Sequence, residues 1–264
     1  MPRIPLSEEN TEKAMNNLDI LLRCFEITKK EAETGVDISA GYLTRLANPT
    51  NGKKLSFDLQ LKLEKFLDIP QFTLNNENIE YPESEDEFII KVLEKMNRQT
   101  KNGELRWKEI KQEHFGALPA VWNEIFTTAL AQDEPFVGEK VELRKDDNSG
   151  TYNYMVGSLY ETSISEGQKM YLFETGYATG EYETDYDCYG NPIPYRVLDT
   201  HFELIMKADD NEFRNVADNY RCGMPKKKAL SYSLQRLYKV VVKATQNSVT
   251  KETLDILSKY LNEE

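Results

Sequence analysis

The side chains best suited to contacting another molecule lie in a short stretch between Ser39 and Leu46. Tyr42, Thr44 and Arg45 fall at helical spacings that turn their hydroxyl and guanidinium groups outward, whereas Leu43 and Leu46 turn inward. A short helix with small, hydroxyl and arginine side chains along its first turns can enter the major groove of DNA and hydrogen-bond to base edges. The residues that we expect to face the bases are Ser39, Ala40, Gly41, Tyr42, Thr44 and Arg45.

Basic and polar residues lie on both sides of this stretch. Lysines precede it, and a polar loop with further lysines follows it. Such side chains can hold the phosphate backbone while others read the bases. The residues that we expect at the backbone are Lys29, Lys30, Asn48, Lys53 and Lys54.

Two short helices joined by a tight turn, over residues 27–46, must position these groups. The second helix is predicted to begin at Ser39, whose hydroxyl can accept a hydrogen bond from an otherwise unpaired backbone N–H. Asp37 lies in the turn, where aspartate tolerates a left-handed conformation better than most residues. An amphipathic helix opening at Ser7 precedes the pair, and a helix over 56–69 follows it and is stopped by Pro70.

The segment from about 18 to 69 resembles the helix-turn-helix of the Cro/C1 (XRE-type) repressors. The resemblance rests on the opening run 27–30, the turn 36–39, the stretch 41–46, the polar loop 48–54 and the closing helix 56–69. It implies a helix-turn-helix DNA-binding domain over residues 1–72 that recognises an operator in double-stranded DNA. Where the family has glycine in the turn, this chain has Asp37.

The charge of the chain argues against nonspecific binding of nucleic acid. The 264 residues carry a formal net charge of −12, whereas phosphate neutralisation requires an excess of lysine and arginine. The motif itself is close to neutral, with seven basic and six acidic residues from Glu26 to Phe66. Weak nonspecific affinity means that specific binding needs two half-sites, so we expect a homodimer.

The rest of the chain predicts a second domain and an α+β protein. Polar and acidic residues over 73–84 indicate a linker, and residues 85–264 are predicted to form an α+β domain for oligomerisation or partner binding. After a helix from Phe88, β-rich and tyrosine-rich runs predict an antiparallel sheet that is acidic between 158 and 200. Helices are then predicted over 209–221, over 224–245 and after Thr250.

The composition gives little support for an enzyme. His114 and His201 are the only histidines, and there is no phosphate-binding glycine loop, nucleophile elbow or metal-ligand spacing. We therefore expect no catalysis and no cofactor. Three cysteines at wide spacings favour free thiols in a reducing cytoplasm, and no apolar run is long enough to span a membrane.

Two functions remain open from the sequence. The first is a sequence-specific transcriptional regulator, a dimeric repressor whose second domain oligomerises or senses a partner. The second is a protein inhibitor from a phage or mobile element. Its acidic, tyrosine-rich sheet would bind a nucleic-acid enzyme while the N-terminal domain regulates its own promoter.

Overall fold

The computed structural model describes residues 4–48, 52–110, 141–145, 152–155, 159–165, 167–186, 192–207, 213–219 and 224–261. The chain has an α+β fold, as the sequence predicted, with an N-terminal helical region and an antiparallel sheet. It forms two compact units, of which the first contains residues 1–99 and 221–239 and the second contains residues 100–220 and 240–264.

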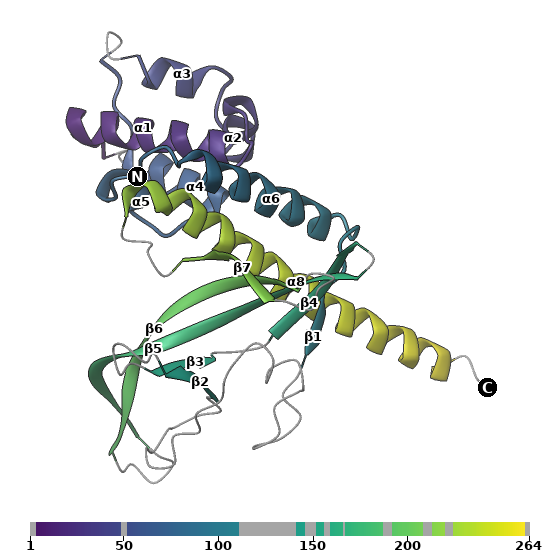
Figure 1. Cartoon of the computed structure of the whole chain (residues 1–264). Coiled ribbons are helices and arrows are strands. Elements are labelled where there is room, and N and C mark those ends of the chain that lie inside the picture. The colour runs from purple at the N-terminus through teal and green to yellow at the C-terminus, as the bar shows by residue number, and fades with distance from the viewer. Residues whose placement is uncertain are drawn as a thin grey trace. The chain divides into compact units, whose positions relative to one another are not determined.

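The first unit is helical (Figure 1). Its elements are α1 (Glu8–Cys24), α2 (Lys29–Gly35), α3 (Tyr42–Leu46), α4 (Phe57–Leu67), α5 (Thr73–Asn76), most of α6 (Ser84–Lys101), the 3-10 turn η2 (Pro225–Lys227) and the first part of α8 (Lys228–Leu261). The helix α1 follows Ser7, as expected, and the Ser7 hydroxyl caps it by accepting the Asn10 N–H at 3.1 Å. Leu18, Leu21, Leu43 and Leu63 are among the fully buried side chains of its core.

The segment expected as a linker is part of this first unit. Residues 73–76 form α5, and Leu74 and Ile79 are buried. The Asn17 side-chain amide of α1 donates to the carbonyls of Leu74 and Glu77, both at 2.9 Å. The units therefore differ from the expected division into 1–72, 73–84 and 85–264, because contacts between residues far apart in sequence decide which segments pack together.

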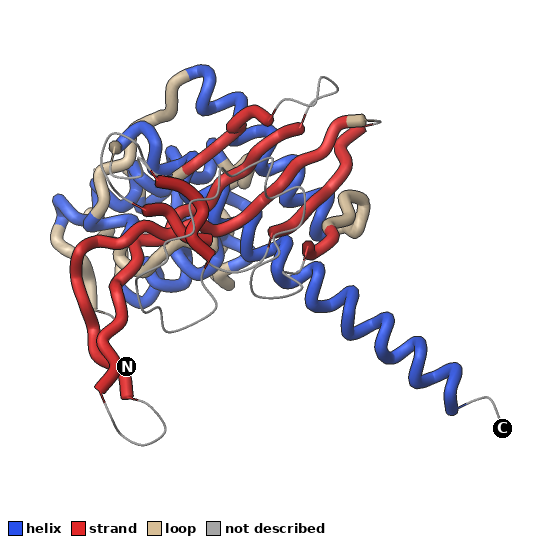
Figure 2. The backbone as a smooth tube through the Cα atoms, turned by 60° about the horizontal axis from the view of Figure 1, so that its bottom comes forward, coloured by secondary structure: helices blue, strands red, loops and turns tan. Residues whose placement is uncertain are grey.

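The sheet of the second unit has seven antiparallel strands in the described part of the chain (Figure 2). They are β1 (Lys108–Ile110), β2 (Val141–Lys145), β3 (Tyr152–Met155), β4 (Leu159–Ser165), β5 (Gln168–Tyr186), β6 (Pro192–Lys207) and β7 (Phe213–Asp218). The order is β1-β4-β5-β3-β2, and β6 pairs with both β5 and β7. Leu172, Phe173 and Leu204 are fully buried in it.

Two predicted helical segments have a different structure. Residues 213–218, expected in a helix, form β7, which pairs with β6 and buries Ala217 in register with Leu204. The two helices expected after Met224 are one helix, α8, because no proline or glycine interrupts residues 228–261. The Thr245 hydroxyl donates to the Val241 carbonyl at 2.9 Å within this helix.

Candidate nucleic-acid interface

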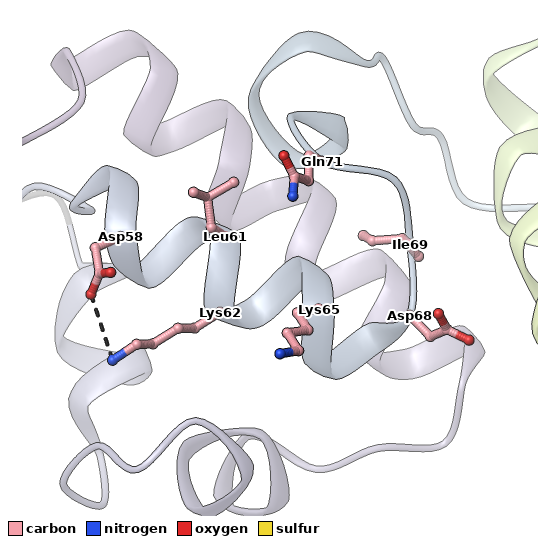
Figure 3. A pocket seen from close by; sticks show the side chains of 7 residues that line it. All are labelled: Asp58, Leu61, Lys62, Lys65, Asp68, Ile69 and Gln71. Atoms are coloured by element: carbon pink, nitrogen blue, oxygen red, sulfur yellow. Dashed lines mark ion pairs between the residues drawn. The ribbon is translucent and has the colours of Figure 1, made fainter.

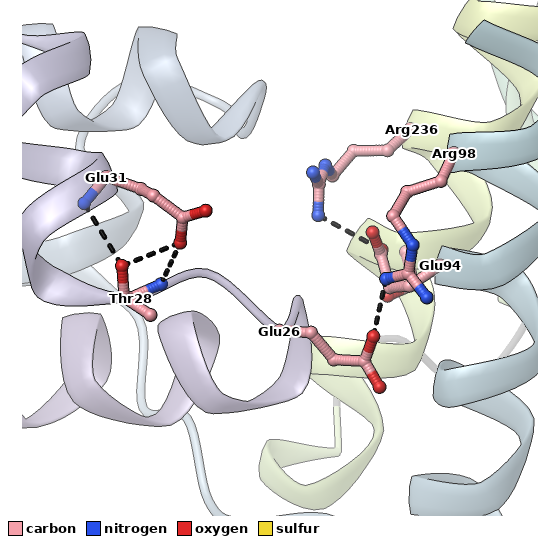
Figure 4. Close-up of polar contacts among 7 residues, drawn as sticks. Glu26, Thr28, Glu31, Glu94, Arg98 and Arg236 are labelled. Atoms are coloured by element: carbon pink, nitrogen blue, oxygen red, sulfur yellow. Dashed lines mark hydrogen bonds and ion pairs between the residues drawn. The ribbon is translucent and has the colours of Figure 1, made fainter. Parts of the chain in front are cut away.

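The helix α2 begins with a reciprocal pair of hydrogen bonds (Figure 4). The Glu31 N–H donates to the Thr28 hydroxyl at 3.1 Å, and the Thr28 N–H donates to the Glu31 carboxylate at 2.7 Å. The Thr28 hydroxyl also donates to this carboxylate, and these bonds lower the pKa of Glu31. The arrangement satisfies backbone donors at the helix start and fixes where α2 begins.

The turn after α2 uses two conformational devices. Asp37 has φ of 57°, so the aspartate takes the left-handed conformation expected at this position. The Ile38 N–H then donates to the Glu33 carbonyl at 2.9 Å and closes the helix end. Gly35 lies against the Phe66 ring of α4. A Cβ at this residue would be 2.2 Å from a ring carbon, so any larger residue would require the ring to shift.

The start of α3 differs from the expected cap. The helix begins at Tyr42, preceded by Gly41 with φ of 73°, and Ser39 does not cap it. The Glu33 carboxylate performs this role instead, since it accepts the Gly41 N–H and the Leu43 N–H, each at 2.7 Å. Glu33 is 3% exposed. A buried carboxylate from α2 therefore replaces the predicted hydroxyl cap.

The outer side of α3 carries the side chains that were expected there. Thr44 and Arg45 are exposed and Tyr42 is half-buried, while Leu43 and Leu46 are buried beneath them. The Arg45 guanidinium lies 5.9 Å from the centre of the Tyr42 ring, and the Lys53 ammonium lies at the same distance. Two cations near one aromatic ring, each worth about 0.5–1 kcal/mol at an exposed site, restrict the positions of all three side chains.

The structure brings only part of the predicted set together at this face. Ser39, Tyr42, Arg45 and Lys53 are neighbours, and the Ser39 hydroxyl lies 3.4 Å from an Arg45 guanidinium nitrogen. The remaining exposed members of the set are Lys30, Ala40, Thr44, Asn48 and Lys54, and Gly41 is half-buried. Lys29 is held away from the set, because its ammonium pairs with Asp19 of α1 at 2.8 Å.

The residue that the sequence reasoning missed is Glu33. The sequence pattern did not predict its contact with α3, where its buried carboxylate accepts backbone N–H groups. The sequence does contain a usable signal, because glutamate followed four residues later by Asp-Ile occurs twice, from Glu33 and from Glu64. Both glutamates are buried.

Two further ion pairs connect distant parts of the first unit (Figure 4). Glu26, after α1, pairs with Arg98 of α6. Glu94 of α6 accepts from the Arg236 guanidinium of α8 at 3.0 Å and from the Ser233 hydroxyl at 2.9 Å. The Arg236 guanidinium also lies 4.0 Å from the centre of the Phe25 ring. Burial lowers the pKa of Arg236, and the Glu94 charge opposes this shift.

A shallow pocket of about 360 Å³ lies along α4 (Figure 3). Its charges are mixed, because Lys62 pairs with Asp58 at 3.6 Å and Asp68 pairs with Lys239 of α8 at 2.8 Å. A pocket lined by charges of both signs does not favour either an anionic or a cationic ligand. The pocket is lined by Asp58, Leu61, Lys62, Lys65, Asp68, Ile69 and Gln71.

Other kinds of site find no support in the described part of the chain. No group of three or more His, Cys, Asp or Glu residues is arranged there to hold a metal ion. Among the helices described, none is both long and apolar enough to cross a bilayer. The acidic, tyrosine-rich surface predicted for 158–200 has its backbone in β4, β5 and β6, but most of its side chains lie outside the described residues.

Comparison with protein-family models, with curated proteins and with solved structures gives no match to this chain.

Proposed function

We propose that this protein is a sequence-specific DNA-binding transcriptional regulator in which α3 enters the major groove. The observation that carries the proposal is the outer face of α3. Thr44 and Arg45 are exposed on a helix whose opposite side is anchored by Leu43 and Leu46. Arginine pairs with guanine edges in two parallel hydrogen bonds, and threonine can hydrogen-bond to bases or contact the thymine methyl group.

Exposed lysines support the same proposal. Lys30, Lys53 and Lys54 are exposed close in sequence to α2 and α3, and each can neutralise a phosphate. Three such contacts give only weak binding to one half-site against a net charge of −12. The regulator therefore acts as a homodimer on a two-fold symmetric operator and functions as a repressor in the cytoplasm.

The second unit supplies oligomerisation or partner sensing in this proposal. The alternative function, inhibition of a nucleic-acid enzyme by an acidic sheet, stays a prediction, because the side chains of β5 beyond Glu174 lie outside the described residues. No described contact favours it over the regulator.

The test is selection of duplexes by the full-length protein from a random library, followed by gel shifts with the selected duplex and a scrambled one at two salt concentrations. We expect enrichment of one symmetric sequence. Arg45→Ala should weaken binding to it about 5- to 150-fold, the equivalent of one bidentate base contact. Arg106→Ala is the matched control, since Arg106 is an exposed arginine outside the helix-turn-helix. Failure of any duplex to enrich would refute the proposal.

A further inference from the structure

Glu33 is a buried residue of α2 that contacts the start of α3. Its carboxylate is 3% exposed, and both oxygens accept backbone N–H groups, Oε2 from Gly41 and Oε1 from Leu43. Each bond measures 2.7 Å, which is short for an N–H donor and typical of a charge-assisted bond. One carboxylate on α2 thus holds the start of α3 at two points.

We propose that Glu33 is the positioning residue that sets the reading face of α3, an inference that rests on the proposed function. The helix α3 has only five residues and no side-chain cap of its own. Helices of this length are unstable in isolation, because nucleation costs more than a few hydrogen bonds return. The direction of α3 therefore depends on tertiary contacts, and Glu33 supplies those at its first turn.

The carboxylate is required for this role, because two donors converge on it. An ionised carboxylate only accepts hydrogen bonds, so each oxygen can face one N–H. Glutamine has one accepting oxygen and one donating nitrogen of nearly the same shape. Glu33→Gln would therefore keep one bond and place an N–H against the other donor, turning the first turn of α3 away from its wild-type direction.

The chain provides a matched control in Glu64 of α4. Its carboxylate accepts the Phe72 N–H and the Leu74 N–H, both at 2.9 Å, at the start of α5. The donors lie eight and ten residues after each glutamate in both cases. Thr73 and Leu74 of α5 are buried, and the Asn17 side chain of α1 donates to the Leu74 carbonyl, so α5 is packed against α1. Glu64→Gln repeats the chemical change of Glu33→Gln without touching α3.

The first experiment needs no DNA. Amide hydrogen exchange of the full-length protein, followed by NMR, should show protected Gly41 and Leu43 N–H groups in the wild type. In Glu33→Gln we expect protection of these two amides to fall about 10-fold or more while Leu74 is unchanged, with the reverse pattern in Glu64→Gln. Unprotected Gly41 and Leu43 amides in the wild-type protein would overturn the proposal even if a variant fails to fold.

The second experiment measures specificity. Affinities for the selected duplex and for a scrambled duplex are compared at a temperature where circular dichroism shows all proteins to be folded. Glu33→Gln should lower the ratio of the two affinities about 10-fold, with little change for the scrambled duplex, whereas Glu64→Gln should preserve the ratio. Equal losses on both duplexes, or equal effects of the two variants, would show a merely structural role and overturn the proposal. If the wild type selects no duplex, the regulator fails while the exchange result still decides whether Glu33 holds α3.

Discussion

The α2–α3 and α4–α5 segments of the first unit share one local plan. In each, a buried glutamate accepts two N–H groups at the start of a following short helix. In each, an aspartate with φ near 55° ends the first helix, and the next residue is an isoleucine whose N–H donates to the glutamate's carbonyl. A residue with positive φ then precedes the short helix in both, Gly41 in one and Phe72 in the other.

The segments differ in what the short helix presents. The α3 helix exposes Thr44 and Arg45, while α5 buries Thr73 and Leu74 and is held to α1 by Asn17. Gly41 leaves the start of α3 uncrowded, whereas Phe72 lies against the Phe57 ring with centroids 5.6 Å apart. The same backbone arrangement can therefore expose side chains of the short helix or bury them, depending on which side chains that helix carries.

The largest effect should come from removing the support that α8 gives to this unit. Arg236→Ala would leave the Glu94 carboxylate buried without its charge partner, so we expect a loss of about 3–5 kcal/mol in the free energy of unfolding. Urea unfolding of the full-length protein measures it. Lys239→Ala is the control, because the Lys239–Asp68 pair is half-exposed and should contribute about 0–1 kcal/mol. A small effect of Arg236→Ala would show that the Glu94–Arg236 pair contributes little to the stability of the first unit.

Replacing Glu33 or Glu64 by alanine tests whether the two carboxylates contribute equally to the free energy of unfolding. Each variant leaves two backbone donors without an acceptor, at about 1–3 kcal/mol per buried donor. Glu64→Ala should cost more than Glu33→Ala, because the Glu64 carboxylate also accepts from the Gln60 amide at 2.9 Å. Chemical denaturation of the two variants side by side gives the comparison, and a larger loss for Glu33→Ala would contradict it.

Gly35→Ala tests the point where the two segments touch. The new methyl group would overlap the Phe66 ring, and overpacking of this kind costs about 1–3 kcal/mol. Thermal unfolding should show a lower Tm for the variant. Adding Phe66→Leu should recover part of the loss, since it removes the ring that the methyl group meets. If Phe66→Leu lowers the Tm further, overlap with the Phe66 ring is not the cause of the instability of Gly35→Ala.

The smallest effect concerns the start of α2. Thr28→Val removes the hydroxyl that lowers the pKa of Glu31, so this pKa should rise towards its ordinary value. A depressed carboxylate pKa stabilises the fold above the unfolded-state pKa, and this contribution is lost as the pH falls through the folded-state pKa. NMR titration of the Glu31 carboxyl carbon in both proteins measures the change. An unchanged pKa in Thr28→Val would assign the shift to another group.

Local features of the first unit were predictable from the sequence. The opening of the first helix at Ser7, the presence of a helix within 56–69 and the left-handed Asp37 all follow from residue preferences that act over a few positions. The outward placement of Thr44 and Arg45 follows from helical spacing alone. These are the features for which propensity and packing agree.

Features that depend on distant residues were missed. Ser39 has the right chemistry for a cap, but Glu33 reaches the same donors from the preceding helix and displaces it. Residues 213–218 look helical by composition, yet pairing with β6 makes them a strand, because strand formation depends strongly on the neighbouring strand. The join of residues 221–239 to the N-terminal unit depends on contacts such as Glu94 with Arg236, which no local pattern encodes.

The helix α8 limits how the chain can be cut into fragments or exchanged between genes. Its residues up to Lys239 complete the first unit, and those from Val240 onward belong to the second. An N-terminal fragment that stops before residue 221 lacks Leu230, Leu234 and Arg236, all of which are buried in the intact chain. Recombination could not transfer the first unit to another protein as a single contiguous block of gene, because residues 221–239 of that unit are encoded after the strands of the second unit.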